Sequence, residues 1–161
     1  MDKNLTFSDH LEKTIKKATS RIKLLSRIRH NISPYTAETI YKVTILPILL
    51  YCNNVFLHMA PSKKALFENI QKRALKVING NRHSVKLEKI SSIRNKMCAL
   101  EVFKTLNGVS PHAFQNYFTR VNHSQCTRAN TKNIVLPKVK SETGKKAFSF
   151  QGAKIFNKPT D

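Results

Sequence analysis

Acidic residues are scarce in this sequence. The chain of 161 residues holds 9 Asp and Glu against 29 Lys and Arg, a formal net charge of +20. No two carboxylates are adjacent, and the three aspartates, Asp2, Asp9 and Asp161, lie near the two ends. Because two-metal nucleotidyl transfer needs carboxylates that converge on the metal ions, the sequence predicts no catalytic residues of a polymerase or nuclease. We expect this chain not to be an enzyme by itself.

Glycine and cysteine are also rare, with 4 and 3 copies. Four glycines leave no Gly-rich phosphate loop, which argues against ATP-driven chemistry. Cys52, Cys98 and Cys126 are too scattered for a disulfide framework, and we expect free thiols. His123 and Cys126 are spaced like two zinc ligands, but a structural zinc site needs four and no second pair is evident. No metal and no cofactor are therefore predicted.

Long apolar runs are missing too. Residues 1–4 are polar and lack the apolar stretch of a secretory signal. The most apolar stretch, residues 43–56, is interrupted by Pro47 and two asparagines and is shorter than the roughly 20 residues of a membrane span. We expect an intracellular protein, in the nucleus or cytoplasm, with no membrane partner and no small-molecule substrate.

Apolar residues recur at helical spacing through the first 118 residues, and 40% of the chain is hydrophobic, enough for a core. Pro47 is expected to kink or split the second helix, which is apolar on nearly every face and belongs at the centre. The first predicted helix begins at Ser8 or Asp9, and the second begins at Ser33-Pro34. The third runs from Ser62 to Gly80, and the fourth runs from Glu88 to Asn107, just before Gly108. A short fifth helix is predicted from Ser110-Pro111 to Phe118.

The pattern changes after Phe118. Residues 119–161 lose helical periodicity and hold nine Lys and Arg against two acidic residues. Alternation in residues 134–136 and 147–150 is compatible with a short β-hairpin. The expected architecture is mainly α: a helix bundle over residues 1–118, followed by a loop-rich basic C-terminal extension over residues 119–161.

Basic residues of the first and third predicted helices fall opposite the apolar stripes. One such face by itself is often only a solvated surface, but the charge of the whole chain favours a polyanion, above all nucleic acid held by its backbone. In the extension, Phe148, Phe150 and Phe156 lie among lysines and either stack on unpaired bases or pack on the core. The predicted nucleic-acid-binding residues are Lys13, Lys16, Lys17, Lys23, Arg27, Lys72, Arg73, Lys76, Arg128, Lys138, Lys140, Lys145 and Lys146.

Several short segments occur in an informative order. They are residues 4–11, Ser33-Pro34, Ile45-Leu46-Pro47 with Tyr51-Cys52, residues 70–75 with Ile78-Asn79-Gly80, residues 103–111, Thr143-Gly144, Phe148-Ser149-Phe150, Gly152-Ala153 and Phe156-Asn157. Together they resemble the region after the catalytic palm in reverse transcriptases of non-LTR (LINE-type) retrotransposons. Phe56 and Phe156 stand where that family usually has Trp, and Lys158 where a Leu is usual.

The resemblance implies a thumb and connecting region without the active site. In the intact family this region is expected to grip template RNA and the RNA–DNA hybrid while the palm does the chemistry. The implied partners are nucleic acid, as RNA, DNA or hybrid, and the palm and fingers of a reverse transcriptase.

Two other functions compete with this one. A protein-interaction module would have apolar helix surface that needs a missing palm partner. A peripheral membrane protein would use the cationic first helix, but we rank it last because the apolar face of that helix has no Trp and no Phe.

Overall fold

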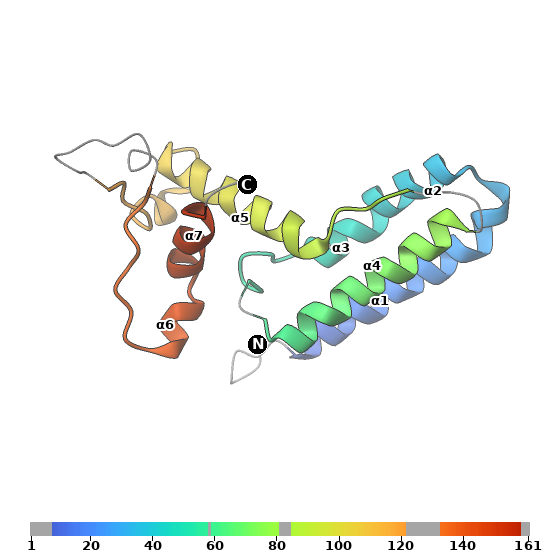
Figure 1. The fold of residues 1–161 in the computed structure, drawn as a ribbon, viewed down its shortest axis with the longest axis horizontal. Helices are drawn as coiled ribbons and strands as arrows, with labels where there is room; N and C mark the ends of the chain where they lie inside the picture. Colours follow the sequence, from blue (N-terminus) through green and yellow to red (C-terminus); the bar gives the residue numbers. More distant parts are fainter. Residues whose placement is uncertain (1–7, 58, 81–84, 122–132, 159–161) are drawn as a thin grey trace. The chain divides into compact units, whose positions relative to one another are not determined.

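The computed structural model describes residues 8–57, 59–80, 85–121 and 133–158. The chain is mainly helical, as predicted, and these ranges contain no β-strand, only an isolated antiparallel bridge between Arg120 and Ile134 (Figure 1). It forms two compact units, residues 1–51 with 60–91, and residues 52–59 with 92–161. The boundary predicted at residue 118 falls inside the second unit.

The first unit is built from three helical segments. The chain runs along the first, returns along the second and runs forward again along the third (Figure 1). Helix α1 packs against α4, η2 and α3. The elements are α1 (Ser8–Ile28), the 3₁₀ turn η1 (Arg29–Asn31), α2 (Pro34–Ile40), the π-helix η2 (Tyr41–Ile45), α3 (Leu46–Leu50) and α4 (Pro61–Asn79).

The core of this unit follows from the apolar spacing of α1 and α4. Each helix buries side chains separated by three, four or seven residues, which places them on one helical face. The apolar stripe predicted for the first helix is thereby confirmed, although Ile15, which continues the same spacing between Leu11 and Ala18, is only partly buried. The buried apolar residues are Leu11, Ala18, Ile22 and Leu25 of α1, and Phe67, Ile70, Ala74 and Ile78 of α4.

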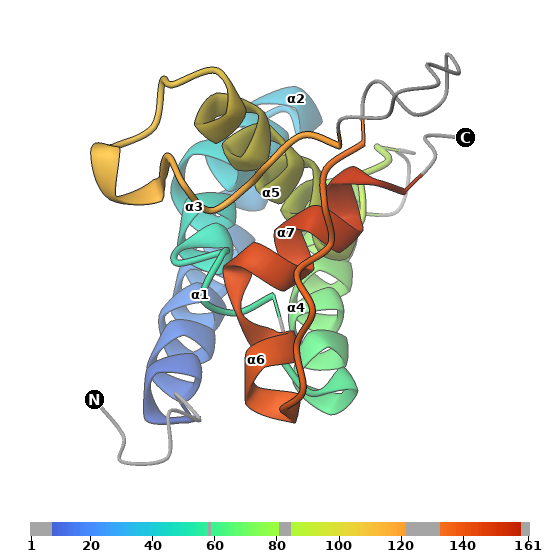
Figure 2. The same ribbon diagram turned by 90° about the vertical axis from the view of Figure 1, so that its left-hand side faces the viewer.

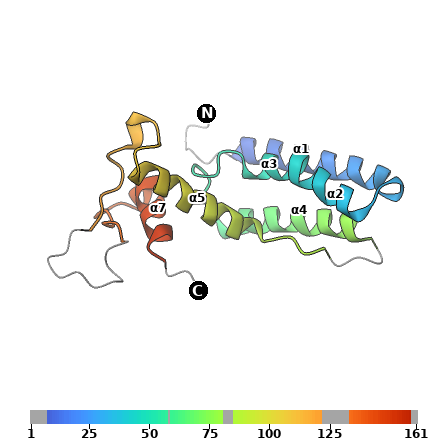
Figure 3. The ribbon, with the colours of Figure 1, turned by 90° about the horizontal axis from the view of Figure 1, so that it is seen from above.

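The segment from α2 to α3 stays helical through Pro47, which was expected to kink or split it, but changes helix type just before that residue. Proline has no N–H to donate one turn back, and the π-helix η2 directly precedes the turn that holds Pro47. The segment from α2 to α3 runs beside α1 (Figure 3). Buried residues recur every four positions, at Ala37, Tyr41, Ile45 and Leu49. Four residues of α-helix overshoot a full turn by about 40°. The wider π-helical turn offsets this drift and keeps the four side chains in the core.

Side chains of α4 fix the segment that follows it. The Gln71 amide donates to Glu88 O at 2.7 Å and accepts from Ile90 N at 3.2 Å. Glu68 Oε1 accepts from Ser91 N at 2.9 Å. Since the first N–H groups of a helix have no partner within it, Gln71 and Glu68 together satisfy two such groups at the start of α5.

The second unit contains most of α5 (Ile90–Leu106), the 3₁₀ turn η3 (His112–Phe114), α6 (Glu142–Lys146) and α7 (Phe148–Phe156). Its core consists of Val102, Phe118, Ile134 and Ala153. Helix α7 lies against α5 (Figure 2). A Cβ atom at Gly152 would lie only 2.9 Å from both Phe118 and Val102, so this close packing requires glycine.

Three predictions for the part of the chain after residue 109 are wrong. No hairpin joins residues 134–136 to 147–150, because Ile134 pairs with Arg120 and the second of these segments begins α7. Phe148, Gly152 and Phe156 share one helical face, which places them together at the core. Residues 119–161 are therefore not free of helix. In addition, the short helix expected over residues 110–118 is only the single turn η3.

Candidate nucleic-acid interface

The predicted binding residues lie at the surface. Arg128 is outside the described residues, and the other twelve are exposed. Eight of them belong to α1 and α4 in the first unit, and four belong to the second unit. The two units are considered separately below.

Helix α1 presents the longest row of cations. Its buried stripe at Leu11, Ala18, Ile22 and Leu25 turns the opposite face to solvent. The five predicted residues of this helix spread over four turns of that face, and none of them is paired with a carboxylate among the described residues. They are Lys13, Lys16, Lys17, Lys23 and Arg27.

Helix α4 adds three cations in its C-terminal half. Lys72, Arg73 and Lys76 are exposed and, in the part of the chain that the structure describes, have no ion-pair partner. A cation near the last turn is favoured by the partial negative charge of a helix C-terminus. The side chains of both rows are therefore available to an outside anion.

Arg29 shows the contrasting case of a structural arginine. Its Nε donates to Ile78 O at 2.9 Å and its Nη1 donates to Ile32 O at 2.8 Å. The Ile78 carbonyl belongs to the last turn of α4, where carbonyls have no partner within the helix. Arg29 thus ties the C-terminal ends of α1 and α4 together, and two of its five N–H donors are used within the protein.

The second unit has a smaller cationic group around α6. Lys138 and Lys140 precede this helix, and Lys145 and Lys146 end it. Lys145 Nζ lies 2.6 Å from a carboxylate oxygen of Glu142, and this hydrogen bond lowers the pKa of Glu142. Because its charge is already paired with this carboxylate, Lys145 is a weaker candidate than its three neighbours.

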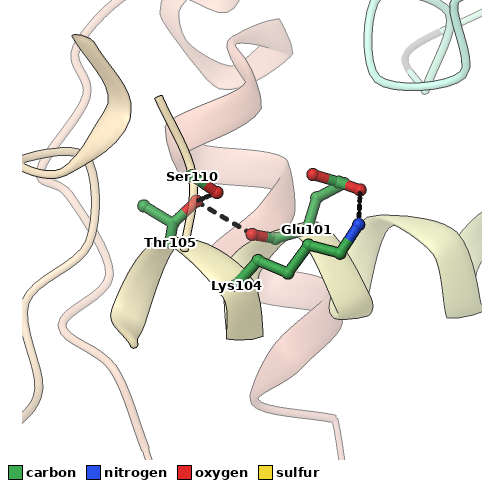
Figure 4. A network of polar contacts seen from close by, with 4 residues as sticks. All are labelled: Glu101, Lys104, Thr105 and Ser110. Carbon is green, nitrogen blue, oxygen red and sulfur yellow. Dashed lines mark hydrogen bonds and ion pairs between the residues drawn. The ribbon is translucent and has the colours of Figure 1, made fainter. Parts of the chain in front are cut away.

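Sequence reasoning missed a hollow of about 550 Å³ in the second unit. Its wall combines the segment after α3, α5, the turn that follows α5, and residues at the junction of α6 and α7. Thr105 and Ser110 join in the wall, with their hydroxyl oxygens 3.0 Å apart (Figure 4). Two of the family-like segments, residues 103–111 and 148–150, contribute to this wall, but spacing alone does not bring Asn54, Ser110 and Phe148 together.

The thiols follow the prediction where they are described. Cys52 and Cys98 are free, and Cys98 is fully buried, as expected of a small apolar residue. Burial raises the pKa of the Cys98 thiol to about 11. Cys126 and His123 lie outside the described residues. Within the described ranges no three His, Cys, Asp or Glu side chains gather as a metal site, and no helix is long and apolar enough to cross a bilayer.

Comparisons of the chain with models of protein families, with curated proteins and with solved structures give no match.

Proposed function

We propose that the chain is the non-catalytic thumb and connecting region of a LINE-type RNA-directed DNA polymerase. It binds template RNA or RNA–DNA hybrid by the backbone, through the cationic faces of α1 and α4. The order of the family-like segments in the sequence supports the origin. The observation that carries the binding is the set of eight exposed cations without carboxylate partners on these two helices.

Phosphate contacts of this kind have a thermodynamic signature. Each neutralised phosphate releases counterions, so log K falls with log salt by about 0.7 to 0.9 per contact. Fluorescence anisotropy with RNA–DNA hybrid, duplex DNA and single-stranded RNA of equal length, at several salt concentrations, measures this slope. We expect the tightest and steeply salt-dependent binding with the hybrid. An affinity that does not change with salt would contradict the proposal.

A matched pair of double variants locates the contacts. Lys16→Gln with Lys23→Gln removes two unpaired charges from α1, and should lower the salt slope by about 1.4 to 1.8. Lys42→Gln with Lys104→Gln removes the same charge from lysines that pair with Glu38 and Glu101. This control should leave the slope within about 0.5 of the wild-type value. Equal losses in both variants would show that only net charge matters.

A second candidate function is a protein-interaction module that needs a palm partner. Leu100 and Phe103 on α5 are 52% and 54% exposed, and Met97 lies one turn before Leu100. Uncovered apolar surface of this kind favours association. Size-exclusion chromatography at high salt tests this function, since a monodisperse monomer would argue against an uncovered interface.

A further inference from the structure

The hollow in the second unit has the dimensions and wall of a ligand site. Small-molecule sites are mostly apolar and have volumes of about 300 to 1,000 Å³, with a few polar groups that set orientation. Here the volume is about 550 Å³, and the apolar wall includes Val55, Pro111, Phe114 and Phe148. Phe114 is 39% exposed, and the Phe148 ring is nearly perpendicular to the Phe118 ring, with a centroid distance of 5.4 Å. The two phenyl rings offer apolar surface to a flat ring system.

The two hydroxyl groups in the wall, of Thr105 and Ser110, can accept hydrogen bonds from a ligand but cannot donate them. Thr105 Oγ1 donates its one proton to Glu101 O at 2.8 Å. In the 3.0 Å contact between Thr105 Oγ1 and Ser110 Oγ, the proton must therefore come from Ser110 (Figure 4). Ser110 Oγ has no second proton, so it can only accept a hydrogen bond from a ligand.

A second wall group, Glu101, is also an acceptor. Its carboxylate accepts from Lys104 Nζ at 2.8 Å through one oxygen and retains lone pairs on both. The Ser110 hydroxyl and the Glu101 carboxylate therefore both offer acceptors to a ligand. N–H donors are the groups that complement this wall.

A single cation, Lys146, also lines the hollow. It is exposed and follows Lys138 and Lys140, which are exposed as well. Lysine binds phosphate as a point charge. The ligand therefore combines a planar aromatic ring, N–H donors and an adjoining anion.

We infer that this hollow takes one unpaired nucleobase that carries an exocyclic amino group, with the neighbouring phosphate at Lys146. The inference rests on the proposed function, because the backbone-binding cations bring the strand to the protein. The base stacks against Phe114 and Phe148 and donates to Ser110 and Glu101. Adenine, cytosine and guanine satisfy these acceptors, whereas uracil and thymine have only one N–H between two carbonyls.

The test uses the full chain and three oligodeoxynucleotides of one length, measured by anisotropy at several salt concentrations. One strand is wholly abasic, one has a single central adenine, and one has a single central purine without the amino group. Stacking of one base contributes about 1 to 3 kcal/mol, so the adenine strand should bind at least about fivefold more tightly than the abasic strand. The purine strand should lie between them.

Two variants assign that advantage to the hollow. Phe114→Leu should reduce the advantage of adenine over the abasic strand, while Phe103→Leu, an equally conservative change on exposed α5 surface outside the wall, should preserve it. Ser110→Ala should reduce the difference between adenine and purine. Circular dichroism confirms that each variant is folded.

The outcomes separate the inference from the proposed function. Equal affinities for the adenine and abasic strands, both salt-dependent, would overturn the inference and leave backbone binding intact. Absence of salt-dependent binding to the abasic strand would overturn the proposed function. Free adenosine monophosphate is the last comparison. If it binds as tightly as the adenine strand, the hollow takes free nucleotides, and the inference that it takes a base within a strand is overturned.

Discussion

At the scale of single residues, Asn157 fixes the backbone of Ile134, which lies outside the helices of the second unit. Its Nδ2 donates to Ile134 O at 2.8 Å, and its Oδ1 accepts from Ile134 N at 3.0 Å. Ile134 is 2% exposed, so water cannot replace these bonds. One amide side chain therefore satisfies both backbone groups of a core residue.

Asn157→Ala should lower the free energy of unfolding by about 2 kcal/mol, because it leaves a buried donor and a buried acceptor unpaired. Asn107→Ala is the matched control, since it removes one exposed hydrogen bond to Phe103 O. The control should lose about 0.5 kcal/mol. Urea denaturation measures both, and equal losses would contradict the bridging role of Asn157.

Tyr41 makes the stability of the first unit depend on pH in the alkaline range. Burial of its side chain raises the pKa of the phenol from 10.0 to about 12. The adjacent Gln71 amide is already bonded to the backbone of Glu88 and Ile90, and the hydroxyl has no partner among the described atoms. The folded state therefore strongly prefers the protonated phenol.

Because the folded pKa lies above the unfolded one, the folded state binds more protons between these values, and stability falls as pH rises. The contribution of Tyr41 is constant below pH 10 and is lost between pH 10 and about 12. Cys98 adds a similar loss that begins near pH 9. Tyr41→Phe should flatten unfolding profiles above pH 10 while changing stability at pH 7 by less than about 1 kcal/mol. A profile unchanged by this substitution would exclude Tyr41 as the cause.

At the scale of secondary structure elements, the contact between α5 and α7 depends on Gly152. In a helix interior, glycine replaced by alanine usually stabilises by about 1 kcal/mol. Here the added methyl group would meet Phe118 and Val102 at 2.9 Å, and both belong to the core.

We therefore expect the opposite sign for Gly152→Ala, a loss of about 1 to 3 kcal/mol from overpacking. Lys154→Ala, on the exposed side of α7, should change stability by less than about 0.5 kcal/mol. Thermal unfolding followed by circular dichroism compares them. A stabilised Gly152→Ala variant would show that α5 and α7 separate without loss.

The elements also show where sequence reasoning succeeds. Helices α1 and α4 span 21 and 19 residues, enough turns for their apolar periodicity to be unambiguous. The ends were marked by local chemistry: Ser33 Oγ accepts from Thr36 N at 3.1 Å, and Gly80 and Gly108 adopt positive φ after α4 and α5. Helices α6 and α7 have five and nine residues, and two alternating phenylalanines at the start of α7 imitate a strand.

The candidate sites differ in the same way. Exposed cations on a long amphipathic helix follow from its periodicity, so the faces of α1 and α4 were predictable. The hollow was not, because its wall joins residues 54, 110 and 148, and only tertiary packing places them together. The predicted cation at Arg128 lies outside the described residues.

At the scale of the whole molecule, positive charge is present in both units. Residues 1–51 and 60–91 hold 17 Lys and Arg against 6 acidic residues, and the remaining residues hold 12 against 3. Such an excess destabilises a compact state by self-repulsion, and a bound polyanion relieves it. Binding of nucleic acid would therefore also raise the folding stability of each unit.

The bridge near Arg120 has a consequence for the exchange of backbone amide protons. Val121 N donates to Asn133 O at 3.0 Å, and Val135 N donates to Thr119 O at 2.8 Å. An amide proton held in such a bond exchanges with solvent only when the bond opens. The exchange rates of the Val121 and Val135 amides therefore report how often this part of the second unit opens.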